Sequence, residues 1–171
     1  MSLELELELE RNKKAKYQNN EFQEQMIAWV GNRRWDSFVT LTFRNKVSSK
    51  VASKTLNQFF KHLGRTCLGK SKQDIKRVPV LEHTASASHY HIVLNKPENW
   101  TDEGFKREMR DCWSKLKGTG ICNLVLRNNG KESSWYEEIG NTKEDIERVV
   151  GYMTKTVGDN NEALDVMGVR L

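Results

Sequence analysis

His89 and His91 are the residues of this sequence best placed to bind a metal ion. They lie in the segment Ser88-His-Tyr-His-Ile-Val-Leu94, whose β-branched and aromatic residues predict a strand over residues 88–94. Side chains alternate between the two faces of a strand, so both imidazoles lie on one face and Tyr90 lies on the other. Imidazole is a common metal ligand, and two imidazoles placed in this way can bind one ion.

Glu82 supplies an acidic side chain close to this pair. It ends a second predicted strand, residues 76–82, and residues 84–87 are suited to close a hairpin between the two strands. Pairing of the strands places the carboxylate beside the imidazoles, which gives a three-ligand metal site with open positions. Pro79 has no backbone N–H, so we expect the first strand to lie at a sheet edge or to contain a bulge.

Alternating histidines also occur as ordinary half-exposed strand residues, so the metal interpretation depends on the rest of the chain. The strand predicted over residues 35–43 has an apolar face that we expect to meet helices, formed by Val39, Leu41 and Phe43. Its other face carries Thr40 and Thr42. These threonines are therefore expected on the same open sheet face as the histidines.

The last predicted helix displays a tyrosine away from its apolar stripe. It opens with Thr142 and Asp145, a start that resembles a capping box, and is expected to reach about residue 157. At about 100° per residue, Tyr152 lies about 120° from the centre of the stripe and Lys155 lies nearly opposite it. The stripe consists of Ile146, Val149, Val150, Met153 and Val157.

Three segments, in this order along the chain, resemble the motifs of the HUH endonucleases, which are metal-dependent nucleases that start rolling-circle replication or mobilise DNA. They are Phe38-Val-Thr-Leu-Thr-Phe43, His89-Tyr-His91 and Gly151-Tyr-Met-Thr-Lys155. The resemblance spans most of residues 35–157. In the family, a bulky apolar residue usually stands where this chain has Tyr90.

The resemblance implies roles for individual residues. His89, His91 and Glu82 would bind Mg²⁺ or Mn²⁺, and Tyr152 would be the nucleophile with Lys155 as its catalytic partner. The single tyrosine indicates the one-tyrosine subclass. The implied reaction is the nicking of single-stranded DNA or an origin hairpin through a covalent 5′-phosphotyrosine intermediate, followed by rejoining.

Further residues are expected to contact DNA. The DNA-binding candidates are Thr40, Thr42, Arg44 and Lys54. Trp135 or Tyr136 would either stack on a base or pack within a hairpin. A chain of 171 residues without a phosphate-binding loop has no motor domain, so we expect a helicase from the host or from a separate gene.

Composition is consistent with a polyanionic partner. Residues 11–80 hold sixteen lysines and arginines against four acidic residues, although the whole chain has a net charge of only +5. The cysteines, Cys67, Cys112 and Cys122, are far apart and suit a reducing compartment. No apolar run approaches a membrane span, so we expect an intracellular, cytoplasmic protein that contacts no membrane.

The predicted fold class is α+β, an antiparallel sheet of four or five strands with helices packed on one face, of the ferredoxin-like or RNA-recognition-motif-like kind. Further helices are predicted near residues 20–32, 49–64 and 101–118, and an Asn-Gly turn predicts a hairpin of strands 121–127 and 133–139. We divide the chain into a low-complexity segment with a Leu-Glu repeat (residues 1–16), a catalytic domain (17–158) and a tail (159–171). The oligomeric state is not evident from the sequence.

Three other functions suit parts of the same pattern. A one-tyrosine transposase also combines paired histidines with a tyrosine on a helix, and it would join element ends instead of nicking an origin. A non-catalytic nucleic-acid-binding module would bind DNA regardless of chelation or of Tyr152. A two-histidine, one-carboxylate iron oxygenase shares the ligand set, but its second histidine usually comes from far along the chain.

Overall fold

The computed structural model describes residues 21, 23–69, 74–120, 125–126, 132–133, 135–140, 142–154, 165 and 168–171. The Leu-Glu repeat, the predicted Asn-Gly turn and Lys155 lie outside the described residues. Within the described part of the chain, no helix is long and apolar enough to cross a membrane.

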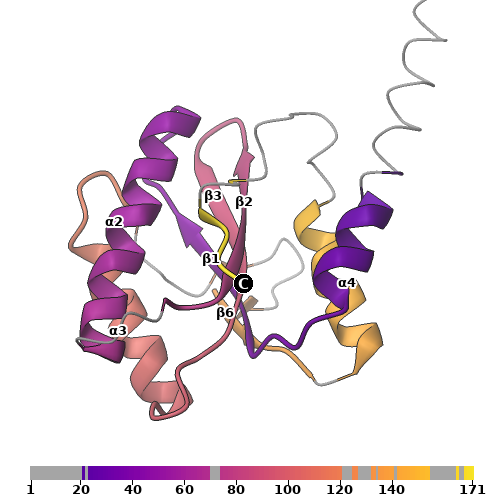
Figure 1. Ribbon diagram of the computed structural model, residues 1–171. Coiled ribbons are helices and arrows are strands. Elements are labelled where there is room, and N and C mark those ends of the chain that lie inside the picture. The colour runs from indigo at the N-terminus through magenta and orange to yellow at the C-terminus, as the bar shows by residue number, and fades with distance from the viewer. Residues whose placement is uncertain are drawn as a thin grey trace, which may run out of the picture.

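Four antiparallel strands form the central sheet, in the spatial order β2-β3-β1-β6 (Figure 1). Their bounds are Ser37–Thr42 for β1, Arg77–His83 for β2, Ser88–Leu94 for β3 and Tyr136–Glu138 for β6. β2 is an edge strand, as Pro79 predicts, and it pairs with β3 as the predicted hairpin. β3 pairs with β2 on one side and with β1 on the other, so the histidine strand is central.

The second predicted hairpin is divided in the structure. β4 (Val125–Leu126) pairs with β5 (Glu132–Ser133) in a separate two-stranded ladder. The chain then continues into β6, which joins the main sheet by pairing with β1. The strand predicted over residues 133–139 therefore serves two different sheets.

One face of the sheet is covered by α2 (Ser49–Leu68) and α3 (Asp102–Ser114). Ser48 caps α2, and the helix passes through Gly64, its predicted end, to stop at Gly69, whose φ of +61° suits glycine. Thr101 caps α3, as the sequence predicts. The apolar residues of both helices pack on the apolar face of β1 and β3, in a core that includes Val39, Leu41, Leu56, Phe59, Tyr90, Ile92, Met109 and Trp113.

Part of the other face is covered as well. α4 (Lys143–Thr154) and a helix over residues 23–31 lie together on that side (Figure 1). Their stripes pack on a second apolar cluster, which includes Met26, Val30, Phe38, Val78, Val80, Val93, Val149, Val150 and Met153. The predicted fold class is confirmed, but the helices occupy both faces because the strands are apolar on both.

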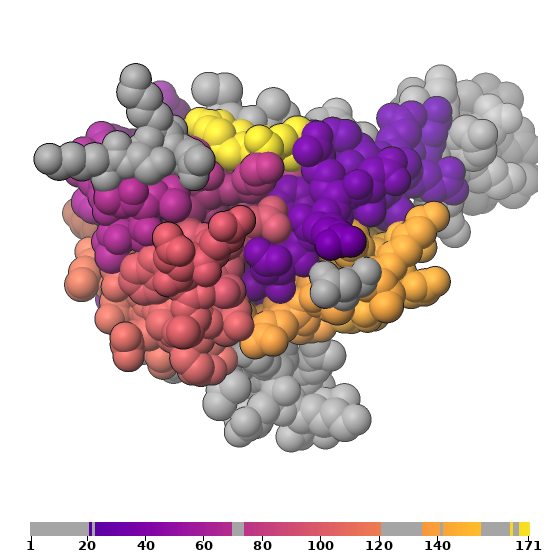
Figure 2. Space-filling view, turned by 60° about the horizontal axis from the view of Figure 1, so that its bottom comes forward, coloured from indigo at the N-terminus to yellow at the C-terminus, as the bar shows by residue number. Residues whose placement is uncertain are grey.

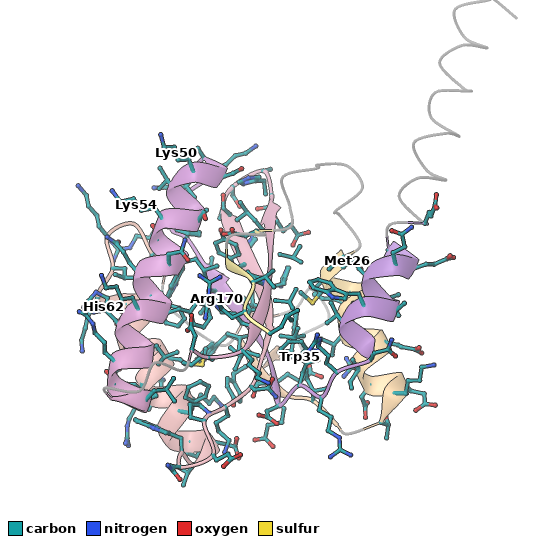
Figure 3. The ribbon with its side chains drawn as sticks, viewed as in Figure 1. Met26, Trp35, Lys50, Lys54, His62 and Arg170 are labelled. Carbon is teal, nitrogen blue, oxygen red and sulfur yellow. The ribbon has the colours of Figure 1, made fainter. Side chains whose placement is uncertain are left out.

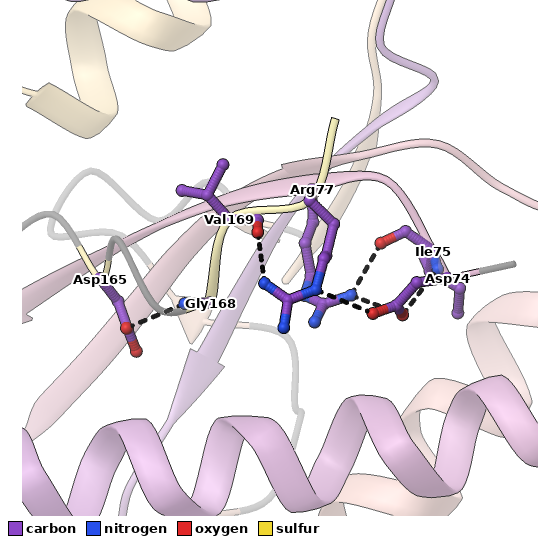
Figure 4. A network of polar contacts seen from close by, with 7 residues as sticks. Asp74, Ile75, Arg77, Asp165, Gly168 and Val169 are labelled. Carbon is purple, nitrogen blue, oxygen red and sulfur yellow. Dashed lines mark hydrogen bonds and ion pairs between the residues drawn. The ribbon is translucent and has the colours of Figure 1, made fainter. Parts of the chain in front are cut away.

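The last residues of the chain close the edge of β2. Arg170 and Arg77 exchange two backbone hydrogen bonds, and the Arg170 guanidinium lies 3.2 Å from Asp74. Arg77 is 2 % exposed; its guanidinium donates to Asp74 and lies over the ring of Phe60 (Figure 4). In the space-filling view the yellow C-terminal residues lie between the magenta part of the chain and the indigo helix (Figure 2). This segment covers backbone groups that an edge strand would otherwise expose.

Asp165, in the same segment, binds the tyrosine of the histidine strand. The buried Tyr90 hydroxyl donates to Asp165 Oδ2 at 2.8 Å, and Ser53 of α2 donates to Oδ1 at 3.2 Å. Burial, followed by the Asp165 charge, raises the pKa of Tyr90. The carboxylate therefore satisfies a hydroxyl that is buried where an apolar side chain would need no partner.

Tyr90→Phe removes this hydrogen bond and keeps the aromatic packing. A hydrogen bond to a charged group contributes about 1.5–3 kcal/mol, so we expect the free energy of unfolding to fall by about 1–2 kcal/mol because Asp165 keeps its other donors. Urea denaturation followed by circular dichroism measures the change. Asp165→Asn, which retains an acceptor, should cost less, and a Tyr90→Phe protein as stable as the wild type would contradict this account.

Candidate active site

The sheet register brings the predicted site residues together in two rows. His89 of β3 lies opposite Thr42 of β1 on one side and opposite Glu82 of β2 on the other. His91 lies opposite Thr40 in the same way. All five side chains project from the face that also carries α4, because the alternate residues of β1 and β3 pack under α2 and α3.

His91 is enclosed by its neighbours. Its Nε2 lies 2.8 Å from Glu82 Oε2, and its Nδ1 lies 3.1 Å from Thr40 Oγ1. The ring of Phe38 stacks on the imidazole with a centroid distance of 5.7 Å and an interplanar angle of 17°. His91 is only 5 % exposed. Both ring nitrogens are thus held by specific partners inside an otherwise apolar environment.

His89 occupies a more open position in the adjacent row. Its Nδ1 lies 3.2 Å from Thr42 Oγ1, and its ring centroid lies 6.4 Å from that of His91. Burial lowers the pKa of His89, and the neighbouring His91 lowers it further, whereas the Glu82 charge acts in the opposite direction. The shift favours the neutral imidazole, which is the form that binds metals.

Tyr152 of α4 reaches the same site. Its ring meets the His91 ring edge to face at 5.4 Å between centroids and the Phe38 ring at 5.9 Å, while the residue remains 46 % exposed. One face of the tyrosine is therefore fixed by aromatic contacts, and the rest is accessible to a substrate. Gln23 of the N-terminal helix donates to the carbonyl of Gly151 at 2.9 Å, which ties α4 to that helix beside the tyrosine.

The ligand set fits in part the divalent ion that the sequence implies. The separation of 2.8 Å between Nε2 of His91 and Oε2 of Glu82 is close to the roughly 3 Å between adjacent ligands of an octahedral ion bound at about 2.1 Å. Each histidine has its Nδ1 at a threonine hydroxyl, the kind of outer contact that orients metal-binding imidazoles. Among the described residues no three such side chains already converge on one point, so Glu82 and His91 fit the ion and His89 would have to approach it.

The other predicted residues lie elsewhere. Arg44 follows β1 and its Nε donates to the carbonyl of Thr119 at 2.9 Å. Lys54 is exposed on α2, across the sheet from the histidines. Trp135 and Tyr136 are 6 % and 4 % exposed, so hairpin packing is the correct interpretation and stacking on a base is not. Lys155 is outside the described residues.

Two features of the site are absent from the prediction. Phe38 is expected on the threonine face, but its stacking on His91 depends on how the side chains pack. The link from Gln23 to Gly151 joins residues 128 positions apart, and no local pattern indicates it.

The fold and the site together define an α+β protein in which a histidine pair, a carboxylate and a tyrosine on a helix share one sheet face. The chain belongs to the replication-associated protein family of the ORF2 type, whose model matches residues 36–161. This membership supports a role in the initiation of replication.

Two further comparisons add little. Among curated proteins nothing matches the chain. Among solved structures, the crystal structure of the hypothetical protein ORF119 from Sulfolobus islandicus rod-shaped virus 1 is similar, with 17 % identity over 78 % of this chain and 91 % of that chain and a TM-score of 0.47.

Thr40→Val and Thr42→Val test whether each threonine orients its own histidine. Each removes one hydroxyl partner of Nδ1, and we expect a loss of about 1 kcal/mol in the free energy of unfolding. In metal-free protein, the imidazole ¹⁵N shifts of His91 should change in Thr40→Val and those of His89 in Thr42→Val. Each variant controls for the other, and equal shifts of both histidines in both variants would contradict separate pairing.

Proposed function

We propose that this protein is a metal-dependent endonuclease that nicks single-stranded DNA at a replication origin and remains attached through a 5′-phosphotyrosine bond. The observation that carries the proposal is the edge-to-face contact of Tyr152 with His91, whose Nε2 is held by Glu82. Residues of β2, β3 and α4 thus meet on one sheet face. Membership in a family of replication-associated proteins supports the same conclusion.

Tyr152 is the proposed nucleophile. Its phenol loses a proton and Oη attacks the scissile phosphorus, while the bond from phosphorus to the 3′ oxygen breaks and that oxygen takes up a proton. The 5′ phosphate is then esterified to the tyrosine. Attack by a 3′ hydroxyl reverses the step, restores a phosphodiester and releases the tyrosine, so the same residue serves nicking and rejoining.

The remaining residues of the site hold and orient the reacting groups. Glu82, His89 and His91 would bind Mn²⁺ or Mg²⁺, and such an ion polarises a phosphate and neutralises its charge. Thr40 and Thr42 would fix the ring orientation of the two histidines. Lys155 keeps the role implied by its place three residues after Tyr152, the stabilisation of developing charge.

The proposed partner is single-stranded DNA or the exposed strand of an origin hairpin. The half-exposed ring of Tyr152 and the buried position of His91 suit a substrate that lies across the open part of this face. We further propose that a separate helicase supplies the single strand.

Tyr152→Phe tests the nucleophile. The variant retains the ring contacts with His91 and Phe38 and lacks only the attacking oxygen, so we expect the loss of all covalent protein–DNA adduct. Wild type and variant are incubated with Mn²⁺ and single strands from the cognate replicon, then resolved on a denaturing protein gel. The affinity for the same strands, measured by fluorescence anisotropy, should change less than about twofold.

Either of two results would contradict the proposal. An adduct that survives in Tyr152→Phe would assign the nucleophile to another residue. If the wild type bound cognate DNA with the same affinity in chelator and formed no adduct, a non-catalytic nucleic-acid-binding module would be the better account.

His91→Ala and Glu82→Gln test the metal site. Calorimetric titration with Mn²⁺ should show affinity reduced more than about tenfold in each variant, since each removes one ligand. His62→Ala is the matched control because this histidine is exposed on α2, on the other side of the sheet (Figure 3). Wild-type Mn²⁺ affinity in both site variants would exclude these residues as ligands.

A further inference from the structure

The outer face of α2 carries a straight row of four cations, Lys50, Lys54, Lys61 and Arg65, here called the α2 ridge. At about 100° per residue all four lie within an arc of about 60°, directly opposite the buried stripe of the helix. The row spans about 22 Å along the axis at about 1.5 Å per residue. All four side chains are exposed, and Lys50 and Lys54 lie on the side of α2 that faces away from the sheet (Figure 3).

No acidic residue balances this charge on the helix. The twenty residues Ser49–Leu68 include no Asp or Glu. Within the described part of the chain, none of the four cations forms an ion pair, and Asp165 beside the helix is engaged by Ser53, Tyr90 and the Gly168 amide. By contrast, the exposed cations of α3 alternate with Asp102, Glu103, Glu108 and Asp111.

The α2 ridge lies on the opposite side of the sheet from the proposed catalytic residues. α2 packs on the face of Val39 and Leu41, whereas His91 and Tyr152 lie on the other face. A nucleotide held at Tyr152 therefore cannot be the group that the ridge contacts. The ridge must meet a different part of the same DNA or a different molecule.

We propose that the α2 ridge binds the phosphate backbone of duplex DNA that flanks the nicked strand, an inference that rests on the proposed function. Duplex DNA carries one negative charge per about 1.7 Å, so a row of about 22 Å faces several base pairs. α2 exposes no aromatic side chain on which single-stranded bases would stack. Its large apolar side chains are mostly buried in the core, which argues against insertion into a membrane surface.

The test is the salt dependence of duplex binding. A ridge variant replaces all four cations with glutamine, a good helix former: Lys50→Gln, Lys54→Gln, Lys61→Gln and Arg65→Gln. Fluorescence anisotropy with a random-sequence duplex gives the slope of log K against log salt. Each lost phosphate contact should make the slope shallower by about 0.9, so the ridge variant should lose about 3.6.

A control variant removes the same number of exposed charges from the region of α3: Arg107→Gln, Arg110→Gln, Lys115→Gln and Lys117→Gln. The slope of this variant should stay within about 1 of the wild type, and circular dichroism verifies the fold of both variants. A conservative variant with Lys50→Arg, Lys54→Arg and Lys61→Arg should keep the wild-type slope. An unchanged slope in the ridge variant, or equal losses in the ridge and control variants, would overturn the proposal.

The result is separable from that of the proposed nuclease activity, because the duplex measurement requires no cleavage. A covalent adduct on single-stranded DNA together with an unchanged ridge slope refutes the ridge alone. A reduced slope in the ridge variant without any adduct from the wild type refutes the nuclease and leaves a duplex-binding surface.

Discussion

The antiparallel pairing of β3 with both of its neighbours is the constraint on which the rest of the structure depends. It places Thr42, His89 and Glu82 in one row and Thr40 and His91 in the next. A shift of either pairing by one residue would turn the histidines towards α2 and α3 and expose the apolar core. The burial of the alternate residues of β3 therefore fixes the face on which the imidazoles lie.

The two faces of the sheet differ in what they offer a nucleic acid. On the histidine face, α4 and the N-terminal helix bury Phe38, Val80 and Val93, and the same packing brings Tyr152 against His91. Core packing therefore sets the geometry of a partly buried site that suits chemistry on one phosphate. On the other face, the α2 ridge presents exposed cations without acidic neighbours on the helix, which suits contact with a backbone regardless of sequence. A replication initiator that holds a duplex while it acts on one strand would use both faces.

Local patterns in the sequence predict much of this arrangement. The alternation around His89 and His91 predicts the strand, and Pro79 predicts the edge position of β2, because both depend on backbone geometry within a few residues. Thr101 and Thr142 predict helix starts for the same reason, although Gly64 is wrong as the end of α2 since a glycine in a packed helix need not terminate it. The metal ligands and the nucleophile stay predictions that follow from motif resemblance.

The sequence by itself determined the elements, the face of each strand and the residue types that could do chemistry. Only the tertiary structure decided that α4 and the N-terminal helix cover the second face, that Phe38 stacks on His91, that Asp165 binds Tyr90 and that Lys54 lies across the sheet from the histidines. The physical reason is range. Helix and strand patterns arise from neighbours within one or two turns, whereas these contacts join distant segments that are selected by the requirement to bury apolar surface on both faces of one sheet.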